Sequence, residues 1–182
     1  MSLKELPVER IVSRIISKEI TVEEVVEYYL ERINKFNHSL NAIVSLKNEE
    51  EIREQARNKN LNKTKEGEEM LLFGLPLAVK DLVDIKGFPT SYGLPELKNN
   101  IATQNSIMVN RLLNHGAIII GKTNTPEFGV GSHTTNKLFG VTANVFDPTK
   151  SAGGSSGGAA SAVASSMVPF ADGSDMMGSC RN

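Results

Sequence analysis

The stretch Leu71-Leu72-Phe73-Gly74-Leu75-Pro76-Leu77-Ala78-Val79-Lys80 marks where the chain changes from charged sequence to the texture of a protein core. Its apolar residues form a nearly continuous run that only Gly74 and Pro76 interrupt. Continuous apolar runs of this kind are typical of strands that are buried on both faces. We therefore expect a buried strand that ends at Lys80.

A second segment further along the chain has the same texture. Apolar residues recur at helical spacing over positions 107–113, and Gly116 then leads into the run Ala117-Ile118-Ile119-Ile120, which Gly121 closes. The spacing predicts a helix followed by a short buried strand. A helix that precedes a buried strand in this way is typical of α/β layering, so we expect an α/β fold.

Residues 1–68 are predicted to form an N-terminal helical region that packs on this core. Apolar residues over positions 8–16 share one helical face. Thr21 and Glu24 form a capping-box pattern ahead of a second amphipathic helix, because each can bond the backbone N–H of the other.

The remaining segments give weaker expectations. A highly charged stretch at about 49–57 is predicted to be a helix, and the polar, lysine-rich residues 58–67 a surface loop. Residues 128–158 are rich in Gly, Ser, Thr and Asn, which favours irregular structure with close backbone approach. An alanine-rich helix is expected over 159–168, followed by a short strand over 169–171.

Composition limits the classes of function. The chain has 182 residues, 40% of them hydrophobic, which is enough for a real core. A net charge of −1 without a basic stripe argues against direct nucleic-acid binding. One cysteine and three histidines show no ligand spacing, so no metal or other cofactor is expected. The single cysteine favours a reducing compartment, the cytoplasm, and no stretch reads as a secretory signal or a membrane span.

Two literal motif matches are rejected because their structural settings are wrong. Residues 116–123 match the phosphate-loop pattern, but the positions between its glycines read as a strand and Pro126 follows closely. Residues 154–158 match the nucleophile elbow of α/β-hydrolases, centred on Ser156. That elbow needs a histidine downstream, whereas the last histidine here is His133.

Lys80, Ser155 and Ser179 together supply a base, a proton relay and a nucleophile without histidine. Taken singly, each has an ordinary alternative. Lys80 could be an exposed strand-end lysine paired with Asp81, and the serines could belong to a turn and a helix flank.

The sequence around these residues resembles the amidase signature family across nearly the whole chain. The resemblance rests on motifs in the family's order: Gly74-Leu75-Pro76-Leu77-Ala78-Val79-Lys80-Asp81, Gly121-Lys122-Thr123-Asn124-Thr125-Pro126-Glu127-Phe128, and Gly153-Gly154-Ser155-Ser156-Gly157-Gly158 leading to Gly178-Ser179. It implies a mixed central sheet covered by helices. Residues 69–182 would form the first part of the family's core and end just after the nucleophile, so the fold is expected to be incomplete in this chain.

The resemblance assigns a role to each member of the set. Ser179 is the nucleophile, Ser155 is a bridging serine reached through a cis peptide bond, and Lys80 is the base. Because only a neutral amine can accept a proton, Lys80 must lose its charge easily. Burial at the end of an apolar run is expected to lower its pKa.

The same resemblance makes Met176, Met177, Gly178 and Gly129 the oxyanion- and substrate-binding residues. Many members carry glycine where this chain has Met177. A positive φ at that position would strain methionine, whereas an ordinary φ would let the thioether line the acyl pocket. We expect the second arrangement, because backbone amides rather than side chains stabilise an oxyanion.

The implied function is hydrolysis of a small carboxylic amide to an acid and ammonia or an amine, through a serine acyl-enzyme. Two alternatives stay open: the A subunit of a glutamine-dependent tRNA amidotransferase, and a non-catalytic fragment of a longer amidase. No membrane partner is expected, and a homo-oligomer is possible.

The residues after Ser179 give two further expectations. Arg181 is expected to brace the loop that carries the nucleophile or to help bind acidic substrates. Cys180 is expected to be a small core hydrophobe. A catalytic pair of Cys180 with His133 is the sharper alternative, but nothing near either residue supports it.

Overall fold

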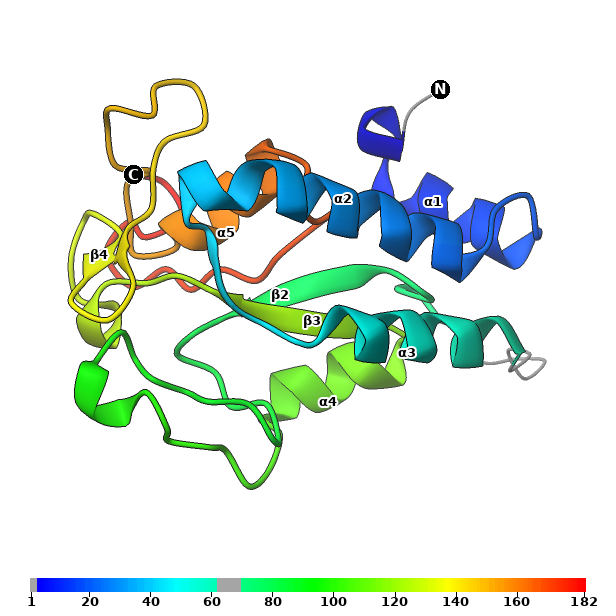
Figure 1. The fold of residues 1–182 in the computed structure, drawn as a ribbon, viewed down its shortest axis with the longest axis horizontal. Coiled ribbons are helices and arrows are strands. Elements are labelled where there is room, and N and C mark those ends of the chain that lie inside the picture. The colour runs from blue at the N-terminus through cyan, green and yellow to red at the C-terminus, as the bar shows by residue number, and fades with distance from the viewer. Residues whose placement is uncertain (1–2, 62–69) are drawn as a thin grey trace.

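A three-stranded sheet with helices on both faces forms the centre of the molecule (Figure 1). The computed structural model describes residues 3–61 and 70–182. In chain order its elements are α1 (Val8–Ile16), α2 (Val22–Leu40), β1 (Ile43–Leu46), α3 (Glu49–Leu61), β2 (Pro76–Lys80), α4 (Ile107–Asn114), β3 (Ile118–Thr123), β4 (Thr135–Asn136), β5 (Gly140–Val141) and α5 (Gly157–Ala164), with short 3-10 turns at Leu3–Glu5, Pro95–Leu97 and Glu127–Gly129.

The sheet is mixed, as the family resemblance implies. Its strand order is β1-β3-β2, with β1 antiparallel and β2 parallel to β3. Lys80 lies opposite Thr123, and the N–H of Asp81 donates to the Thr123 carbonyl at 3.1 Å. Because parallel strands end at the same edge of a sheet, the residues after β2 and β3 meet at one place.

Alternate residues of β2 and β3 face two separate apolar cores. Leu77, Val79 and Ile119 pack with Val109 of α4 on one face. The opposite face contributes Ala78, Ile118 and Ile120 to a larger core with α1, α2, α3 and α5. Every residue of β2 is buried, which explains why that strand reads as a continuous apolar run.

The predicted N-terminal helices are confirmed. Helix α1 covers 8–16, and α2 begins with the predicted capping box. The N–H of Thr21 donates to Glu24 Oε2 at 2.7 Å, and the N–H of Glu24 donates to Thr21 Oγ1 at 3.1 Å. These bonds satisfy two N–H groups that the first turn of the helix would otherwise leave free.

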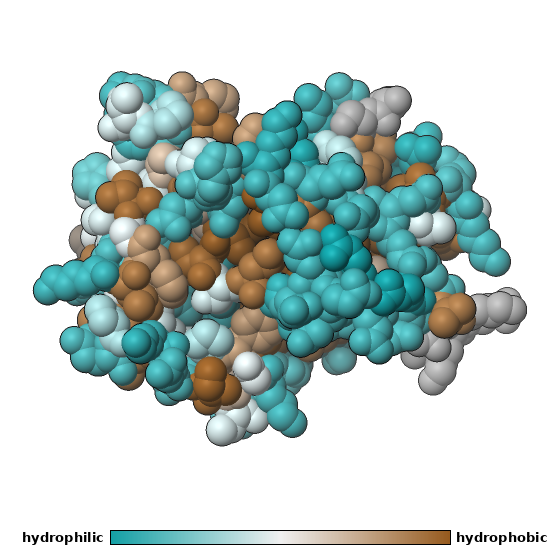
Figure 2. Space-filling view, in the orientation of Figure 1, coloured by the Kyte–Doolittle hydropathy of each residue, from teal (hydrophilic) through white to brown (hydrophobic). Residues whose placement is uncertain are grey.

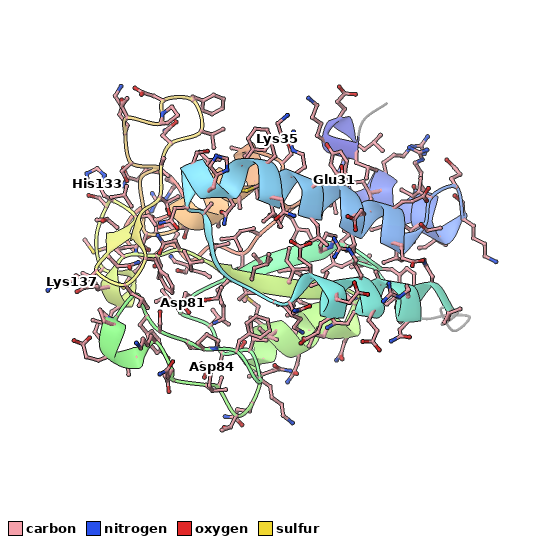
Figure 3. All side chains as sticks on the ribbon, viewed as in Figure 1. Glu31, Lys35, Asp81, Asp84, His133 and Lys137 are labelled. Atoms are coloured by element: carbon pink, nitrogen blue, oxygen red, sulfur yellow. The ribbon has the colours of Figure 1, made fainter. Side chains whose placement is uncertain are left out.

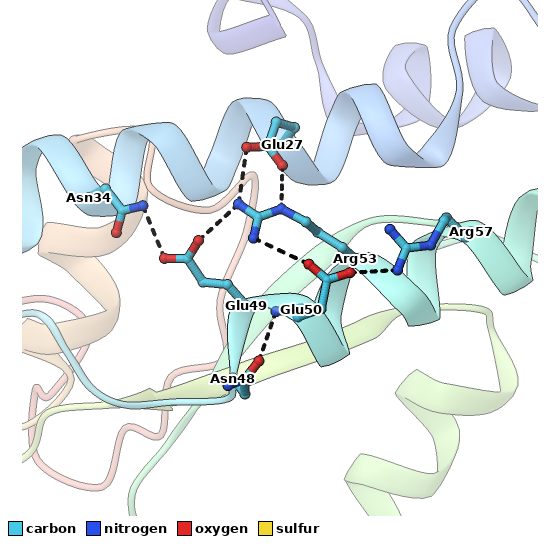
Figure 4. Close-up of polar contacts among 7 residues, drawn as sticks. All are labelled: Glu27, Asn34, Asn48, Glu49, Glu50, Arg53 and Arg57. Carbon is cyan, nitrogen blue, oxygen red and sulfur yellow. Dashed lines mark hydrogen bonds and ion pairs between the residues drawn. The ribbon is translucent and has the colours of Figure 1, made fainter.

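Charged side chains join α2 to α3 at the surface. Arg53 of α3 donates to Glu27 of α2 through Nε at 2.8 Å and Nη2 at 3.1 Å, and also to Glu49 at 2.9 Å (Figure 4). Only Ile52 and Ala56 of α3 are buried. Accordingly, hydrophilic side chains cover α3 in the space-filling view, and hydrophobic ones show in the centre of the same face (Figure 2).

Several predicted boundaries were wrong. Helix α3 continues to Leu61, so the loop predicted over 58–67 begins later, and its residues 62–67 lie outside the described residues. Helix α5 spans 157–164 instead of 159–168. The segment 169–171 forms no strand, although Phe170 and Ala171 pack against the apolar core. The division at residue 68 stays a prediction.

Strand β3 is longer than predicted because it continues through Gly121 to Thr123. A Cβ at Gly121 would lie 2.4 Å from the backbone oxygen of Ser45 in β1. The glycine therefore permits β1 to approach, and does not end the strand. Within the described residues, no helix is long and apolar enough to cross a membrane.

Candidate active site

Lys80 is fully buried at the end of β2 and contacts three hydroxyl groups. Its Nζ donates to Ser155 Oγ at 2.8 Å, and to Ser156 Oγ and Ser174 Oγ at 2.9 Å each. The alternative of an exposed Lys80 paired with Asp81 is therefore wrong. Asp81 instead faces Lys122, with Nζ and Oδ1 3.6 Å apart.

Ser155 is brought to Lys80 by a glycine-rich segment that packs against the ends of the strands. The peptide bond between Gly154 and Ser155 is cis, as the resemblance implies. A Cβ at Gly157 would lie 2.4 Å from Thr134 Oγ1, and one at Gly158 would lie 2.4 Å from the Asn124 nitrogen. The glycines are thus needed for close approach rather than for flexibility.

Ser179 completes a chain of hydrogen-bonded side chains. Ser155 Oγ donates to Ser179 Oγ at 2.9 Å, so the chain runs from Lys80 Nζ through Ser155 to Ser179. The backbone of the two serine segments is also joined, because the Ser156 N–H donates to the Ser179 carbonyl at 3.2 Å. The structure therefore brings together the residues that the sequence singled out.

The turn that carries Ser179 is held by Asp175. Its carboxylate accepts two bonds from Arg181, at 2.8 and 3.0 Å, and bonds from the N–H groups of Gly178 and Cys180 at 2.7 and 3.2 Å. The Arg181 guanidinium, followed by these backbone bonds, holds the pKa of Asp175 well below its ordinary value. Arg181 thus braces the loop.

Burial lowers the pKa of Lys80 below its ordinary value of 10.5. Cys180, Asp172 and Asp175 oppose this effect, because negative charge near Nζ favours the ammonium form. The Lys80 amine can therefore lose its proton more easily than a surface lysine. This is the property that a lysine base needs.

A pocket of about 690 Å³ opens over Ser179. Leu82, Phe128, Val130, Met176 and Met177 give it an apolar wall. Its other lining residues are small or polar: Gly129, Gly131, Ser132, Gly154, Ser155, Ser174, Asp175, Gly178, Ser179 and Asn182. A pocket of this size and lining can accept a small organic acyl group.

The backbone of the segment Met176-Met177-Gly178 agrees with the expectation of an ordinary φ at Met177. Positive φ falls on Gly178, at 114°, and not on Met177, so the methionine is unstrained. Met177 is among the residues that border the pocket, and it is 89% exposed. The N–H of Gly178 is taken by Asp175 and that of Gly129 by the Pro126 carbonyl. Among the described residues, the N–H groups of Met176 and Met177 have no hydrogen-bond acceptor.

Sequence reasoning missed three residues around Lys80. Ser156 was considered only as the centre of the rejected elbow, and Ser174 was not considered. Asp172, whose Oδ1 accepts the Lys80 backbone N–H at 2.7 Å, was also overlooked. The polar run Asp172-Gly173-Ser174-Asp175 after an apolar stretch was the available signal.

The structure also shows the conformation of the phosphate-loop match at residues 116–123 and the surroundings of Cys180. Residues 116–123 form a turn and strand β3, with Lys122 buried, so they do not form a phosphate loop. Cys180 is exposed and belongs to neither apolar cluster, so the expectation of a core residue was wrong; its Sγ contacts Ser156 Oγ and the Ser174 carbonyl.

Other polar residues near this edge of the sheet do not form a metal site. Asp81 and Asp84 follow β2, and His133 and Lys137 lie at the end of the molecule near β4 (Figure 3). Across residues 3–61 and 70–182, no group of three or more His, Cys, Asp or Glu side chains could hold a metal ion.

Comparison with known proteins gives consistent matches. A family profile described as Amidase matches residues 24–182. An acylamidase of Rhodococcus erythropolis is 42% identical over 157 residues, which are 85% of this chain and 32% of that protein. The A subunit of the glutamyl-tRNA(Gln) amidotransferase of Coxiella burnetii is 42% identical over 155 residues, with the same two coverages, 85% and 32%.

A solved structure agrees with these relatives. A bacterial aryl acylamidase, described as one of the amidase signature enzymes, superposes with a TM-score of 0.89 at 34% identity, covering 97% of this chain and 36% of that one. The chain thus spans about a third of the length of the relatives it matches. Since the profile covers residues 24–182 and the fold agrees, the chain belongs to the amidase family of amidase signature enzymes.

Proposed function

We propose that this chain carries the acyl-transfer centre of an amide hydrolase, in which Ser179 is the nucleophile, Ser155 the bridging serine and Lys80 the base. The observation that carries the proposal is the continuous chain of hydrogen bonds from Lys80 Nζ to Ser155 Oγ at 2.8 Å and on to Ser179 Oγ at 2.9 Å. Ser179, at one end of this chain of hydrogen bonds, lines the 690 Å³ pocket, and Lys80, at the other end, is buried.

In the acylation step, Ser179 Oγ forms a bond to the amide carbonyl carbon. The proton of Ser179 passes to Ser155 Oγ while the proton of Ser155 passes to the neutral amine of Lys80. A hydroxyl can accept and donate at once, so the relay runs in either direction. On collapse of the tetrahedral intermediate the C–N bond breaks, and the proton returns through Ser155 to the leaving amine. Water then attacks the acyl-enzyme by the same relay.

Ser156 and Ser174 support this role by orienting the amine. A lysine ammonium has three N–H donors, and three hydroxyls surround Nζ here. When one proton leaves, the two remaining donors can stay on Ser156 and Ser174. The lone pair then points at Ser155, which is the direction that proton transfer requires.

The N–H groups of Met176 and Met177 are the proposed oxyanion donors, since neither has another acceptor among the described residues. Gly178 could join them only by releasing Asp175, and Gly129 only by releasing Pro126. Preorganised backbone donors of this kind stabilise charge that appears only in the transition state.

The direct test is labelling of Ser179 by a fluorophosphonate probe, read by peptide mass spectrometry, together with release of ammonia from benzamide. Ser179→Ala is expected to abolish labelling and to lower any hydrolysis by at least about a thousandfold. Ser151→Ala is the matched control, because its buried hydroxyl has no partner in the described part of the chain. Labelling at another residue, or unchanged hydrolysis in Ser179→Ala, would reject the proposal.

A second candidate is the glutamine-hydrolysing A subunit of a tRNA amidotransferase. The observation that favours it is that the Coxiella burnetii protein is as identical to this chain as the acylamidase is, at 42%. Ammonia release from glutamine that rises when the partner subunits and transfer RNA are added would favour this function over the first.

The proposal includes a small amide substrate and a cytoplasmic location. The apolar pocket wall supports the first, and the single free cysteine the second. No direct nucleic-acid contact or membrane partner is proposed, and the net charge of −1 agrees with the former. Light scattering at several protein concentrations would measure whether the chain forms a homo-oligomer.

A further inference from the structure

Asp172 is joined to Lys80 through the backbone. Strand β2 is at one edge of the three-stranded sheet, and the N–H of its last residue, Lys80, donates to Asp172 Oδ1 at 2.7 Å. The residues that bond are 92 positions apart in sequence. One carboxylate therefore fixes the end of the strand from which the Lys80 side chain starts.

Asp172 also lies near both buried lysines. Its negative charge acts on Lys80 and on Lys122, and both lysines act in turn on Asp172. Burial raises the pKa of Asp172, whereas the bond from the Lys80 N–H favours its charged form. Asp172 forms no direct ion pair with either lysine in the described part of the chain.

The other charges around Lys80 are less able to compensate an ammonium. Asp175 is already paired with Arg181 through two hydrogen bonds. Cys180 is a thiol rather than a carboxylate, and its Sγ contacts Ser156 Oγ and the Ser174 carbonyl. Asp81 faces Lys122, and Asp84 acts on Lys122. Of the two carboxylates that act on Lys80 within the described residues, Asp172 is thus the one that has no directly paired cation.

We propose that Asp172 is a positioning residue and the counter-ion of Lys80: it holds the end of β2 and stabilises the ammonium that forms when Lys80 takes the proton of Ser155. This inference rests on the proposed function. In acylation a proton moves onto Lys80, so positive charge appears in a buried place. A fixed carboxylate makes Lys80 a stronger base without entering the proton relay itself.

The test uses Asp172→Asn, which keeps an oxygen to accept the Lys80 N–H and removes the charge. The pKa of Lys80 is measured by NMR titration of the lysine ε-carbon in the 182-residue chain, with Lys80→Met to assign the signal. We expect Asp172→Asn to lower the pKa of Lys80. Asp84→Asn is the matched control, because Asp84 acts on Lys122 and not on Lys80. An unchanged pKa of Lys80 in Asp172→Asn would overturn the inference.

Asp172→Glu is the second variant and keeps the negative charge. It is expected to leave the pKa of Lys80 close to that of the original chain. If the pKa falls as far as in Asp172→Asn, the cause is a structural change and the inference is overturned.

Kinetics give an independent measure. In Asp172→Asn the acid limb of kcat/KM against pH should move to lower pH, and kcat on the plateau should fall about three- to tenfold, because the base is weaker. If no variant hydrolyses an amide but the NMR shift is found, the proposed function fails and the coupling of Asp172 to Lys80 stands. If the original chain is active and the acid limb does not move, the coupling fails and the proposed function stands.

Discussion

At the scale of single residues, Lys80 shows how the site depends on burial. A lysine enclosed by three hydroxyls is solvated by them rather than by water. The hydroxyls make up for the lost water only in part, since burial still lowers the pKa of the amine. The property that would make Lys80 a base therefore also makes it a source of instability at neutral pH.

The lowered pKa of Lys80 predicts how the stability of the chain changes with pH. In Lys80→Met the buried charge is removed and Ser179 labelling should be lost. The pKa of Lys80 is lower in the folded chain than the 10.5 of an ordinary lysine, so the unfolded state binds more protons between these values. The original chain should therefore gain stability relative to Lys80→Met as pH rises towards 10.5.

The expected gain is about 1.4 kcal/mol for each unit by which folding lowers the pKa. It is measured by urea unfolding of both chains from about pH 7 to the ordinary lysine pKa of 10.5. Lys122 titrates in both chains and so cancels in the comparison. A stability difference that stays constant over this range would show that the pKa of Lys80 is not lowered by folding.

At the scale of elements, the start of α5 depends on contact with the strand ends. Gly158 is in the first turn of the helix, and a Cβ there would meet the Asn124 nitrogen at 2.4 Å and the Asn124 oxygen at 2.5 Å. Both contacts are with backbone, which cannot move aside as a flexible side chain can. The helix therefore approaches the end of β3 as closely as glycine allows.

Gly158→Ala tests this packing, because helix propensity and overpacking predict changes of opposite sign in the free energy of unfolding. Helix propensity alone predicts a gain of about 1 kcal/mol, whereas overpacking predicts a loss of about 1–3 kcal/mol. Because both contacts are with backbone, we expect the upper end of the overpacking loss and therefore a net loss of about 2 kcal/mol in urea unfolding. Labelling of Ser179 should be weaker. Ala160→Gly, at an exposed position of the same helix, calibrates propensity and should cost about 1 kcal/mol. A stabilised Gly158→Ala chain would contradict the packing argument.

The sequence predicted the elements whose own residues determine them. The capping box of α2, the apolar face of α1 and the buried run of β2 are local signals, and all three elements formed. Strand β1 was missed because its four residues are only partly alternating and its pairing with β3 is non-local. Gly121 was taken as the end of β3 because the approach of Ser45 cannot be read from the chain.

At the scale of the whole molecule, the site joins three segments that are far apart in sequence. The end of β2, the glycine-rich segment before α5 and the turn at 174–181 meet at one edge of the sheet. The motifs predicted the residues of the relay because each lies in its own sequence pattern. They did not predict Asp172 or Ser174, because contact with Lys80 depends on how the last segment folds back along β2.

The buried ion pair of Lys122 and Asp81 joins β3 to the segment that follows β2. Lys122 is in β3 and Asp81 follows β2, with side chains 0% and 2% exposed. Lys122 Nζ also donates to the Val83 carbonyl at 2.5 Å, and Asp81 accepts bonds from the N–H and the hydroxyl of Ser91. The pair thus fixes the segment that follows β2 against β3.

A double-mutant cycle of Asp81→Asn and Lys122→Met is expected to show strong coupling. Removing either partner leaves the other buried without its direct ion pair, which should cost about 3–5 kcal/mol in urea unfolding. The double variant has neither charge left, so it should lose clearly less than the sum of the single losses, with a coupling of about 1–3 kcal/mol. Labelling of Ser179 should recover with stability in the double variant, since neither residue touches the relay. Additive losses would mean that the two side chains act on the fold independently, and that the segment after β2 is held by the Ser91 bonds to Asp81 rather than by the ion pair.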